Sequence, residues 1–262
     1  MILFGGTDMT EAKNVPVSYK AIKSIVRCLS PQMRVEGLEN LPEDGAVIVG
    51  NHAQIYGPIA AELYLEGNHH IWCAAQMMAL KEVPAYAYQD FWSTKPWYTH
   101  WYYHLLSYLV APLCVLIFNN AHTIPVYHDA RVMITFRQTL RLLRENAKIV
   151  IFPERAVPHN NIVYDFQDRF IDLAQMYYRL TQKELCFVPM YIAPKLKKMV
   201  LGQPVRYRAG DPLEQERLRI KDELMDAVTR LGQSLPPHTV IPYAMMPRKD
   251  YPSSQDDEQK GR

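Results

Sequence analysis

The residue of this chain best suited to acid–base chemistry is His52, in the segment GNHAQIYGP at residues 50–58. It follows an apolar run and Asn51, so it stands where a buried strand should end. A histidine on such a turn can serve as a general base, because imidazole titrates near neutral pH. A carboxylate often fixes the tautomer of such a base, but the position five residues later is Gly57. Catalytic and purely structural roles for His52 both fit this pattern.

A second polar group stands at another predicted strand end. Glu154 directly follows KIVIFP, and open α/β sheets place their sites at the carboxyl ends of strands. The next residue, Arg155, can bind a phosphate through its planar guanidinium, or it can pair with Asp165 or Glu154. Glu154 itself can contact a substrate or can be a turn carboxylate that pairs with a neighbour. Asn51 also has a structural alternative, because asparagine caps helices and tolerates turn conformations.

Metal and nucleic-acid chemistry find little support in the sequence. His100 and His104 have the i, i+4 spacing of two ligands on one helix face, but no third ligand accompanies them. The surrounding residues are aromatic, so these histidines fit an aromatic belt better than a metal site. A net charge of +2 provides no global field for nucleic acid, and no nucleic-acid module is recognisable. We therefore expect no metal and no nucleic-acid partner.

The pattern of apolar runs predicts an α/β fold with a mixed sheet flanked by helices. The predicted strands are the runs MRVEGL, AVIVGN, HIWCAA, HTIPVYH, AKIVIFPE and ELCFVPMYI. Helical spacing is found in residues 57–67, 130–146 and 213–235, and residues 15–30 form a basic amphipathic pattern. We predict an N-terminal helical segment over 1–33, one domain over 34–243, and a polar, proline-interrupted disordered tail over 244–262.

Residues 86–118 form an aromatic-rich insertion in that domain and include an uncharged run from Leu105 to Phe118. Interfacial or acyl-chain-lining helices are the favoured interpretation, because Trp and Tyr gather at the lipid–water boundary. An ordinary core helix and a true membrane span are the alternatives. Basic residues at 194–198, at 205–208 and in the leading helix also favour contact with an anionic membrane surface.

The chain also carries indications of its compartment. Its four cysteines are far apart among apolar neighbours, which predicts buried free thiols in a reducing environment. The first twenty residues lack the charged start and long apolar core of a secretory signal. We expect a cytoplasmic protein, peripheral to the inner face of the membrane.

Five segments resemble, in order, the glycerolipid acyltransferases of the lysophosphatidic-acid (1-acylglycerol-3-phosphate) acyltransferase type. They lie between about residues 34 and 232 and read VEGLENLPEDGAVIVGNHA, HTIPVYHDA, KIVIFPE, CFVPMYIAP and LGQPV. The residues that match the family's motifs are Asn51, His52, Ile124, Pro125, Val126, Phe152, Pro153, Glu154, Val188 and Pro189. The resemblance implies a single glycerol-phosphate acyltransferase-like domain.

Three motif positions depart from the family pattern. Gly57 stands where the family has the Asp of its His-x4-Asp motif, His128 replaces an Arg, and Arg155 replaces a Gly. In the family, the His takes a proton from an acceptor hydroxyl, and the Asp orients the His. The departures therefore bear directly on the chemistry and on the identity of the acceptor.

The resemblance implies an acyltransferase that moves a fatty acyl group from acyl-CoA or acyl carrier protein to a lipid or amphiphilic acceptor. His52 is the expected general base, Asn51, Glu154, Arg155 and His128 are the expected substrate-binding residues, and no cofactor beyond the acyl donor is expected. The alternative is a catalytically inactive relative that binds lipid or a protein partner. A hydrolase is a third possibility, but the chain has no Gly-x-Ser-x-Gly segment.

Overall fold

An eight-stranded mixed sheet forms the centre of the protein, which is described here by a computed structural model over residues 16–30, 32–93 and 95–255. The strand order is β1-β9-β8-β2-β5-β3-β4, with β10 paired to β8. The strands are β1 (Arg34–Glu36), β2 (Ala46–Gly50), β3 (His69–Ala74), β4 (Thr123–Val126), β5 (Lys148–Ile151), β8 (Cys186–Ala193), β9 (Lys198–Leu201) and β10 (Val205–Arg206). Strands β8, β2, β5, β3 and β4 run parallel, whereas β9 and β10 are antiparallel to β8. The predicted mixed α/β class is therefore confirmed.

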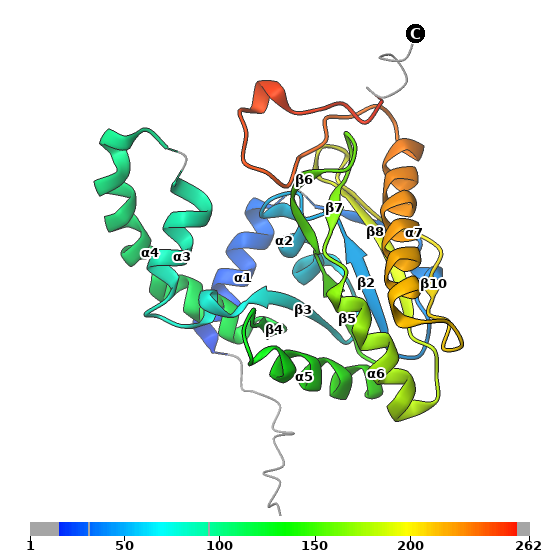
Figure 1. Ribbon diagram of the computed structural model, residues 1–262. Helices are drawn as coiled ribbons and strands as arrows, with labels where there is room; N and C mark the ends of the chain where they lie inside the picture. Colours follow the sequence, from blue (N-terminus) through cyan, green and yellow to red (C-terminus); the bar gives the residue numbers. More distant parts are fainter. Residues whose placement is uncertain (1–15, 31, 94, 256–262) are drawn as a thin grey trace, which may run out of the picture.

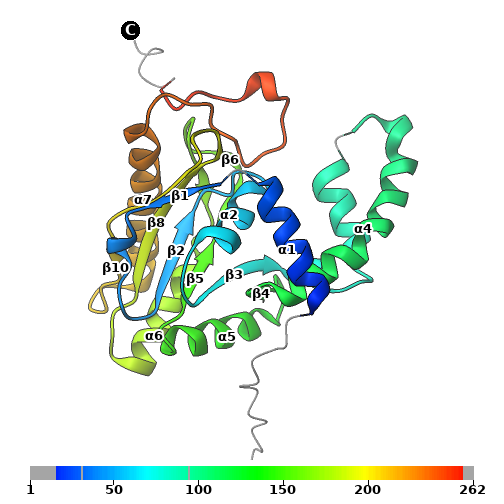
Figure 2. The ribbon, with the colours of Figure 1, turned by 180° about the vertical axis from the view of Figure 1, so that it is seen from behind.

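Helices cover both faces of this sheet (Figures 1 and 2). On one face lie α5 (Val132–Arg144), α6 (Asp172–Thr181) and α7 (Leu213–Ser234), and on the other lie α1 (Val17–Leu29) and α2 (Tyr56–Tyr64). Strand β2 is buried on both sides: Val47 and Val49 join the core beneath α5, α6 and α7, and Ala46 and Ile48 join the core beneath α2. Because side chains alternate along a strand, one continuous apolar run supplies both cores.

The predicted elements are largely confirmed. Each of the six predicted runs contains a strand, and the four helical patterns correspond to α1, α2, α5 and α7. Asn146, the last residue of the helical pattern at 130–146, adopts a positive φ of 60° just after α5. Helix α6, strands β9 and β10, and the two-stranded hairpin of β6 (Glu154–Pro158) and β7 (Tyr164–Phe166) were not predicted.

The aromatic-rich insertion forms a helical arm that projects from one side of the sheet (Figure 1). It contains α3 (Val83–Ala87) and α4 (His100–Asn120), which continues through Pro112. Only Ser107 and Ala111 are buried in α4, and its other residues are exposed or half-buried, so α4 is not an ordinary core helix. The stretch Trp97–Asn120 is long and apolar enough to cross a membrane by length and composition alone.

The segment expected to be a disordered tail is ordered over its described part. Residues 238–255, which we call the C-terminal strap, pair with themselves through a bridge between Thr239 and Ser253 and contain a short 3₁₀ helix at Arg248–Asp250. The Asn161 side chain donates to the Ser253 carbonyl at 2.6 Å, and Ser254 is fully buried. These contacts to distant residues are invisible to a composition argument. Residues 1–15 and 256–262, which complete the predicted terminal segments, lie outside the described residues.

The cysteines agree only in part with the prediction of buried free thiols. Cys28, Cys73, Cys114 and Cys186 are free thiols, but Cys28 is exposed on α1 instead of buried. It lies on the outward side of an amphipathic helix, where neighbouring apolar residues also face solvent.

Candidate functional site

The sheet topology brings His52 and Glu154 together. Strands β2 and β5 are parallel neighbours, with Val49 opposite Ile151, so the residues that follow them emerge at the same edge. The backbone N–H of His52 donates to Oε2 of Glu154 at 2.6 Å. Two of the motifs singled out in the sequence therefore meet at the carboxyl edge of the sheet, as expected for an open α/β fold.

The turn that carries His52 is anchored and strained. Asn51 is buried, its Nδ2 donates to the Ile192 carbonyl at 3.1 Å, and its Oδ1 accepts from the Ile192 amide at 2.7 Å. Asn51 thus joins β2 to β8 with no side-chain atom left for a substrate. Ala53 and Gln54 follow with φ of 45° and 55°, a left-handed conformation that costs a non-glycine residue on the order of 1 kcal/mol or more. Such strain persists only where surrounding contacts enforce it.

The His52 ring lies among aromatic rings instead of beside a carboxylate. Its centroid is 5.4 Å from that of Phe152 and 5.6 Å from that of Tyr243, both in edge-on geometry. In the described part of the chain, the buried Nδ1 atom has no hydrogen-bond partner. Burial lowers the pKa of His52, which keeps the ring neutral at neutral pH. The ring is available as a base, but none of the described carboxylates bonds to it, and the Gln54 backbone only partly offsets the effect of burial on its pKa.

Glu154 is committed to the backbone. It is 3% exposed, and in addition to the His52 amide it accepts the Tyr164 amide at Oε1, at 2.9 Å. Burial raises the pKa of the Glu154 carboxyl to about 7, although the two amide bonds work in the opposite direction. The carboxylate thus fixes the His52 turn to the β6–β7 hairpin, and it does not bond to the imidazole.

The close packing around Gly57 leaves no room for a carboxylate at the fifth position after His52. Its amide donates to the His52 carbonyl at 3.0 Å, so the first turn of α2 lies directly against the His52 backbone. A Cβ atom at Gly57 would stand 2.3 Å from the His52 carbonyl oxygen and 3.1 Å from that of Asn51. This backbone has no space for an aspartate there.

The other two departed positions lie apart from His52. Arg155 is exposed and forms an ion pair with Asp165, which also accepts from Lys221 at 2.7 Å. Its pairing is the structural alternative recognised in the sequence. His128 follows β4 and is exposed at the same edge of the sheet. The site thus consists of His52 and Glu154 in contact. Arg155 follows Glu154 but pairs with Asp165, and His128 follows β4, which is separated from β2 by β5 and β3.

The C-terminal strap completes the surroundings of His52 and was not foreseen. Its Tyr243 contacts the His52 ring and lies 6.0 Å from the ring of Tyr164. Its Tyr251 hydroxyl accepts a hydrogen bond of 2.9 Å from the Gln54 side chain. Tyr251, an aromatic residue within the segment expected to be a tail, was the available signal, since disordered segments contain few aromatic residues.

Two surface hollows lie elsewhere, along β10. One lies between β10 and α7 and is lined by residues that include Arg206, Arg208, Arg219 and Arg230, and the other lies between Asp44, Lys183 and Arg206. Neither is lined by His52 or Glu154.

The fold and the site define a mixed α/β protein with a histidine and a carboxylate at the carboxyl ends of adjacent parallel strands. No family model and no curated protein matches the chain. Among solved structures, it is similar to the 1-acyl-sn-glycerophosphate (LPA) acyltransferase PlsC from Thermotoga maritima, with a TM-score of 0.49 and 12% sequence identity. The similarity covers 83% of this chain and 81% of that one.

Proposed function

We propose that the protein is an acyltransferase that moves a fatty acyl group from acyl-CoA or acyl carrier protein to a lipid or amphiphilic acceptor, with His52 as general base. The observation that supports this most directly is the meeting of His52 and Glu154 at the carboxyl ends of β2 and β5. By accepting the His52 amide, Glu154 fixes the turn that carries the proposed base.

In the proposed reaction, a neutral His52 nitrogen takes the proton of the acceptor hydroxyl while the hydroxyl oxygen attacks the thioester carbonyl carbon. The carbon–sulfur bond then breaks, and the departing thiolate receives the proton from His52. Burial favours the neutral ring that begins this cycle, but it disfavours the imidazolium formed midway. Without an orienting carboxylate, turnover should be slow compared with a fully equipped His–Asp pair.

Acceptor contact is assigned to the margin of the site. Exposed His128 can donate or accept a hydrogen bond at the same sheet edge, and Arg155 can exchange Asp165 for an anionic headgroup. Arg155 starts from an existing ion pair, and Asp165 would keep Lys221 as a partner. Asn51 is not proposed as an acceptor contact, because both polar atoms of its side chain bond to Ile192.

The proposal includes association with the inner face of the membrane through the helical arm. Trp97, Trp101, Leu105 and Leu109 are 82%, 71%, 55% and 69% exposed, and together they form an uncharged aromatic and aliphatic surface. Exposed apolar surfaces of this kind mark binding sites for lipid or protein. A membrane surface would also present the lipid acceptor to the site.

A catalytically inactive acyltransferase-like protein that binds lipid or a partner is the second candidate. The unpartnered Nδ1 of His52 and the lack of space at Gly57 favour it, because both weaken base catalysis. This candidate retains the exposed arm but needs no proton transfer.

Thiol release from palmitoyl-CoA and from acyl carrier protein thioesters, with a panel of lipid acceptors, separates the two candidates. We expect acceptor-dependent release that falls at least a hundredfold in His52→Ala and persists in His100→Ala, a histidine of the arm. Release that is absent from the folded wild type, or is equal in His52→Ala, would reject the enzyme. Binding of an acyl chain without release would then support the inactive relative.

Flotation with anionic phospholipid vesicles tests the arm separately. Leu105→Glu combined with Leu109→Glu should weaken vesicle binding roughly a hundredfold, because each buried leucine contributes about 1.5–3 kcal/mol. Leu218→Glu on α7, where the leucine is 59% exposed, is the matched control and should bind like the wild type. Equal binding by all three proteins would remove the arm from the proposal.

A further inference from the structure

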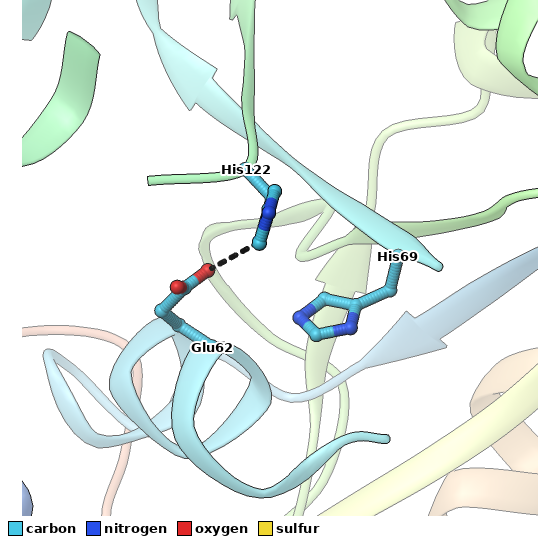
Figure 3. A group of neighbouring side chains, drawn as sticks. All are labelled: Glu62, His69 and His122. Carbon is cyan, nitrogen blue, oxygen red and sulfur yellow. Dashed lines mark ion pairs between the residues drawn. The ribbon is translucent and has the colours of Figure 1, made fainter. Parts of the chain in front are cut away.

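A cluster of a carboxylate and two imidazoles lies at the opposite edge of the sheet from His52. His69 begins β3, His122 precedes β4, and Glu62 lies in the last turn of α2. Figure 3 shows the three side chains pointing toward one another, and one ligand atom from each lies within 4.8 Å of the others. From the geometry we infer that Glu62, His69 and His122 bind a divalent transition-metal ion, with Zn²⁺ the best match. This inference is independent of the acyltransferase proposal.

The strongest support is a pair of buried polar atoms without partners. In the described part of the chain, neither Nε2 of His69 nor Oε2 of Glu62 has a hydrogen-bond partner. His69 is only 6% exposed, and an unsatisfied polar atom at such a buried position destabilises the fold. A cation between the two atoms would satisfy both.

The tautomer of His69 suits a ligand. Its Nδ1 lies 3.2 Å from the Gly67 carbonyl oxygen, which can only accept a hydrogen bond. Nδ1 therefore carries the proton, and Nε2 presents a lone pair toward Glu62 and His122. A backbone carbonyl that fixes the distal nitrogen in this way is a recurrent feature around metal-bound histidines.

Glu62 is arranged to offer one oxygen. Its Oε1 accepts hydrogen bonds from Lys23 at 2.5 Å and from the Tyr19 hydroxyl at 3.0 Å, both on α1. Its Oε2 faces His122, whose Nδ1 is 3.8 Å away. The Lys23 charge opposes a nearby cation and lowers the affinity, but it lies on the other oxygen and leaves the ligand atom free.

The donor set and spacing fit zinc with a small adjustment. Two imidazole nitrogens and one carboxylate oxygen are a known zinc combination, with bonds of about 2.0–2.2 Å and a fourth position for water. Ligand atoms around such a tetrahedral ion stand roughly 3.4 Å apart. The His122 side chain is 58% exposed and can turn inward to close the gap, and its open side leaves room for the water.

The location indicates a structural role. An ion here would join α2, β3 and the connection from α4 to β4, and Glu62 already links this group to α1. It would therefore fix the base of the exposed arm against the sheet. His52 lies at the other end of α2, so the reacting groups of the proposed enzyme are not ligands.

The test is a Zn²⁺ titration of the untagged full chain after treatment with a chelator, followed by calorimetry and by metal analysis after dialysis. We expect one ion per chain in the wild type and at least a hundredfold weaker binding in His69→Ala and in His122→Ala. The matched control is the double variant His100→Ala and His104→Ala, which removes two histidines from the arm and should bind like the wild type. Substituted Co²⁺ should give the visible bands of a tetrahedral site in the wild type and lose them in both single variants.

A wild type that binds clearly less than one ion per chain would overturn the inference. Binding of Zn²⁺ by His69→Ala and His122→Ala with the affinity of the wild type would also overturn it. So would loss of binding in the double variant His100→Ala and His104→Ala. Far-ultraviolet circular dichroism of each metal-free variant separates loss of a ligand from loss of the fold. His122→Ala decides the case if His69→Ala does not fold, because His122 is exposed.

Discussion

The two edges of the sheet hold the same residue types in opposite arrangements. At the carboxyl edge, Glu154 bonds to two backbone amides, and Nδ1 of the nearby His52 ring has no hydrogen-bond partner among the described residues. At the amino edge, Glu62 holds α1 with one oxygen and turns the other toward His69 and His122. A carboxylate committed to backbone amides builds a turn, whereas one with a free oxygen beside imidazoles can bind an ion.

The electrostatics of the two carboxyl groups differ in the same way. Burial raises the pKa of Glu154 to about 7 and outweighs its two amide bonds. Burial also acts to raise the pKa of Glu62, but the hydrogen bond and charge of Lys23, with His122 and Tyr19, bring it below the usual value. Glu154 is therefore easily protonated, and Glu62 stays ionised.

Truncation of Glu154 and of Glu62 should give the largest difference between the two sites in the free energy of unfolding. Glu154→Ala leaves the buried amides of His52 and Tyr164 without an acceptor, so the free energy of unfolding should fall by about 4 kcal/mol. Glu62→Ala in the metal-free chain loses bonds to partly exposed groups and should cost about 1 kcal/mol. Urea denaturation measures both, and equal losses would contradict the assigned roles.

The pH dependence of stability should have opposite signs at the two sites. Between pH 4.5 and about 7 the unfolded chain ionises Glu154 while the folded chain retains its proton. The contribution of Glu154 is therefore complete below pH 4.5 and is lost as the pH rises through about 7, by up to about 3 kcal/mol. The lowered pKa of Glu62 has the reverse effect, with stability present above pH 4.5 and lost in acid. Urea denaturation across this range, with Glu154→Gln and Glu62→Gln as references, isolates each contribution.

The close approach of Gly57 to the His52 backbone predicts a smaller but specific effect. Gly57→Ala should lower the free energy of unfolding by about 2 kcal/mol, because the new methyl group must displace backbone. Gly210→Ala is the matched control, since its Cβ would meet nothing within 4 Å and stability should stay within about 0.5 kcal/mol. Gly57→Asp should not raise acyl transfer. A stable Gly57→Asp variant with higher activity would show that the turn can accept the missing carboxylate.

His122→Ala should give the smallest change in stability. The ring is 58% exposed and lies 3.8 Å from Glu62, so its loss should alter the free energy of unfolding of the metal-free chain by about 0.5 kcal/mol or less. Thermal melting with and without Zn²⁺ checks this, because only the wild type should gain stability from the ion. A large loss in the metal-free variant would make His122 part of the core instead of a ligand.

The sequence predicted much of the frame of the candidate site and little of its bonding. Apolar runs placed Asn51, His52 and Glu154 correctly at strand ends, because a buried parallel strand has a recognisable local pattern. The sequence left substrate contact and a structural role open for both Asn51 and Arg155, and the structure shows Asn51 bonded to Ile192 and Arg155 paired with Asp165. Ile192 lies 141 residues away along the chain, so the partner of Asn51 leaves no local signal.

The cluster of Glu62, His69 and His122 at the amino edge of the sheet shows most clearly what the sequence could not predict. His100 and His104 have the sequence spacing of two metal ligands, but His104 stacks on Tyr88 and His100 bonds to the Lys95 carbonyl. Glu62, His69 and His122 come from a helix, a strand and a loop, and only the pairing of β3 with β4 brings the two imidazoles together.

By itself, the sequence determined six of the strands and four of the helices in their order, the apolar character of residues 86–118, and the positions of His52 and Glu154 at strand ends. These features depend on hydrophobic periodicity and local backbone preference, which a short window of residues contains. Only the tertiary structure decided which atoms each buried polar group contacts, that Gly57 has no space for a carboxylate, and that the strap covers His52. Those outcomes depend on hydrogen bonds and close packing between segments far apart in the chain, which no local pattern encodes.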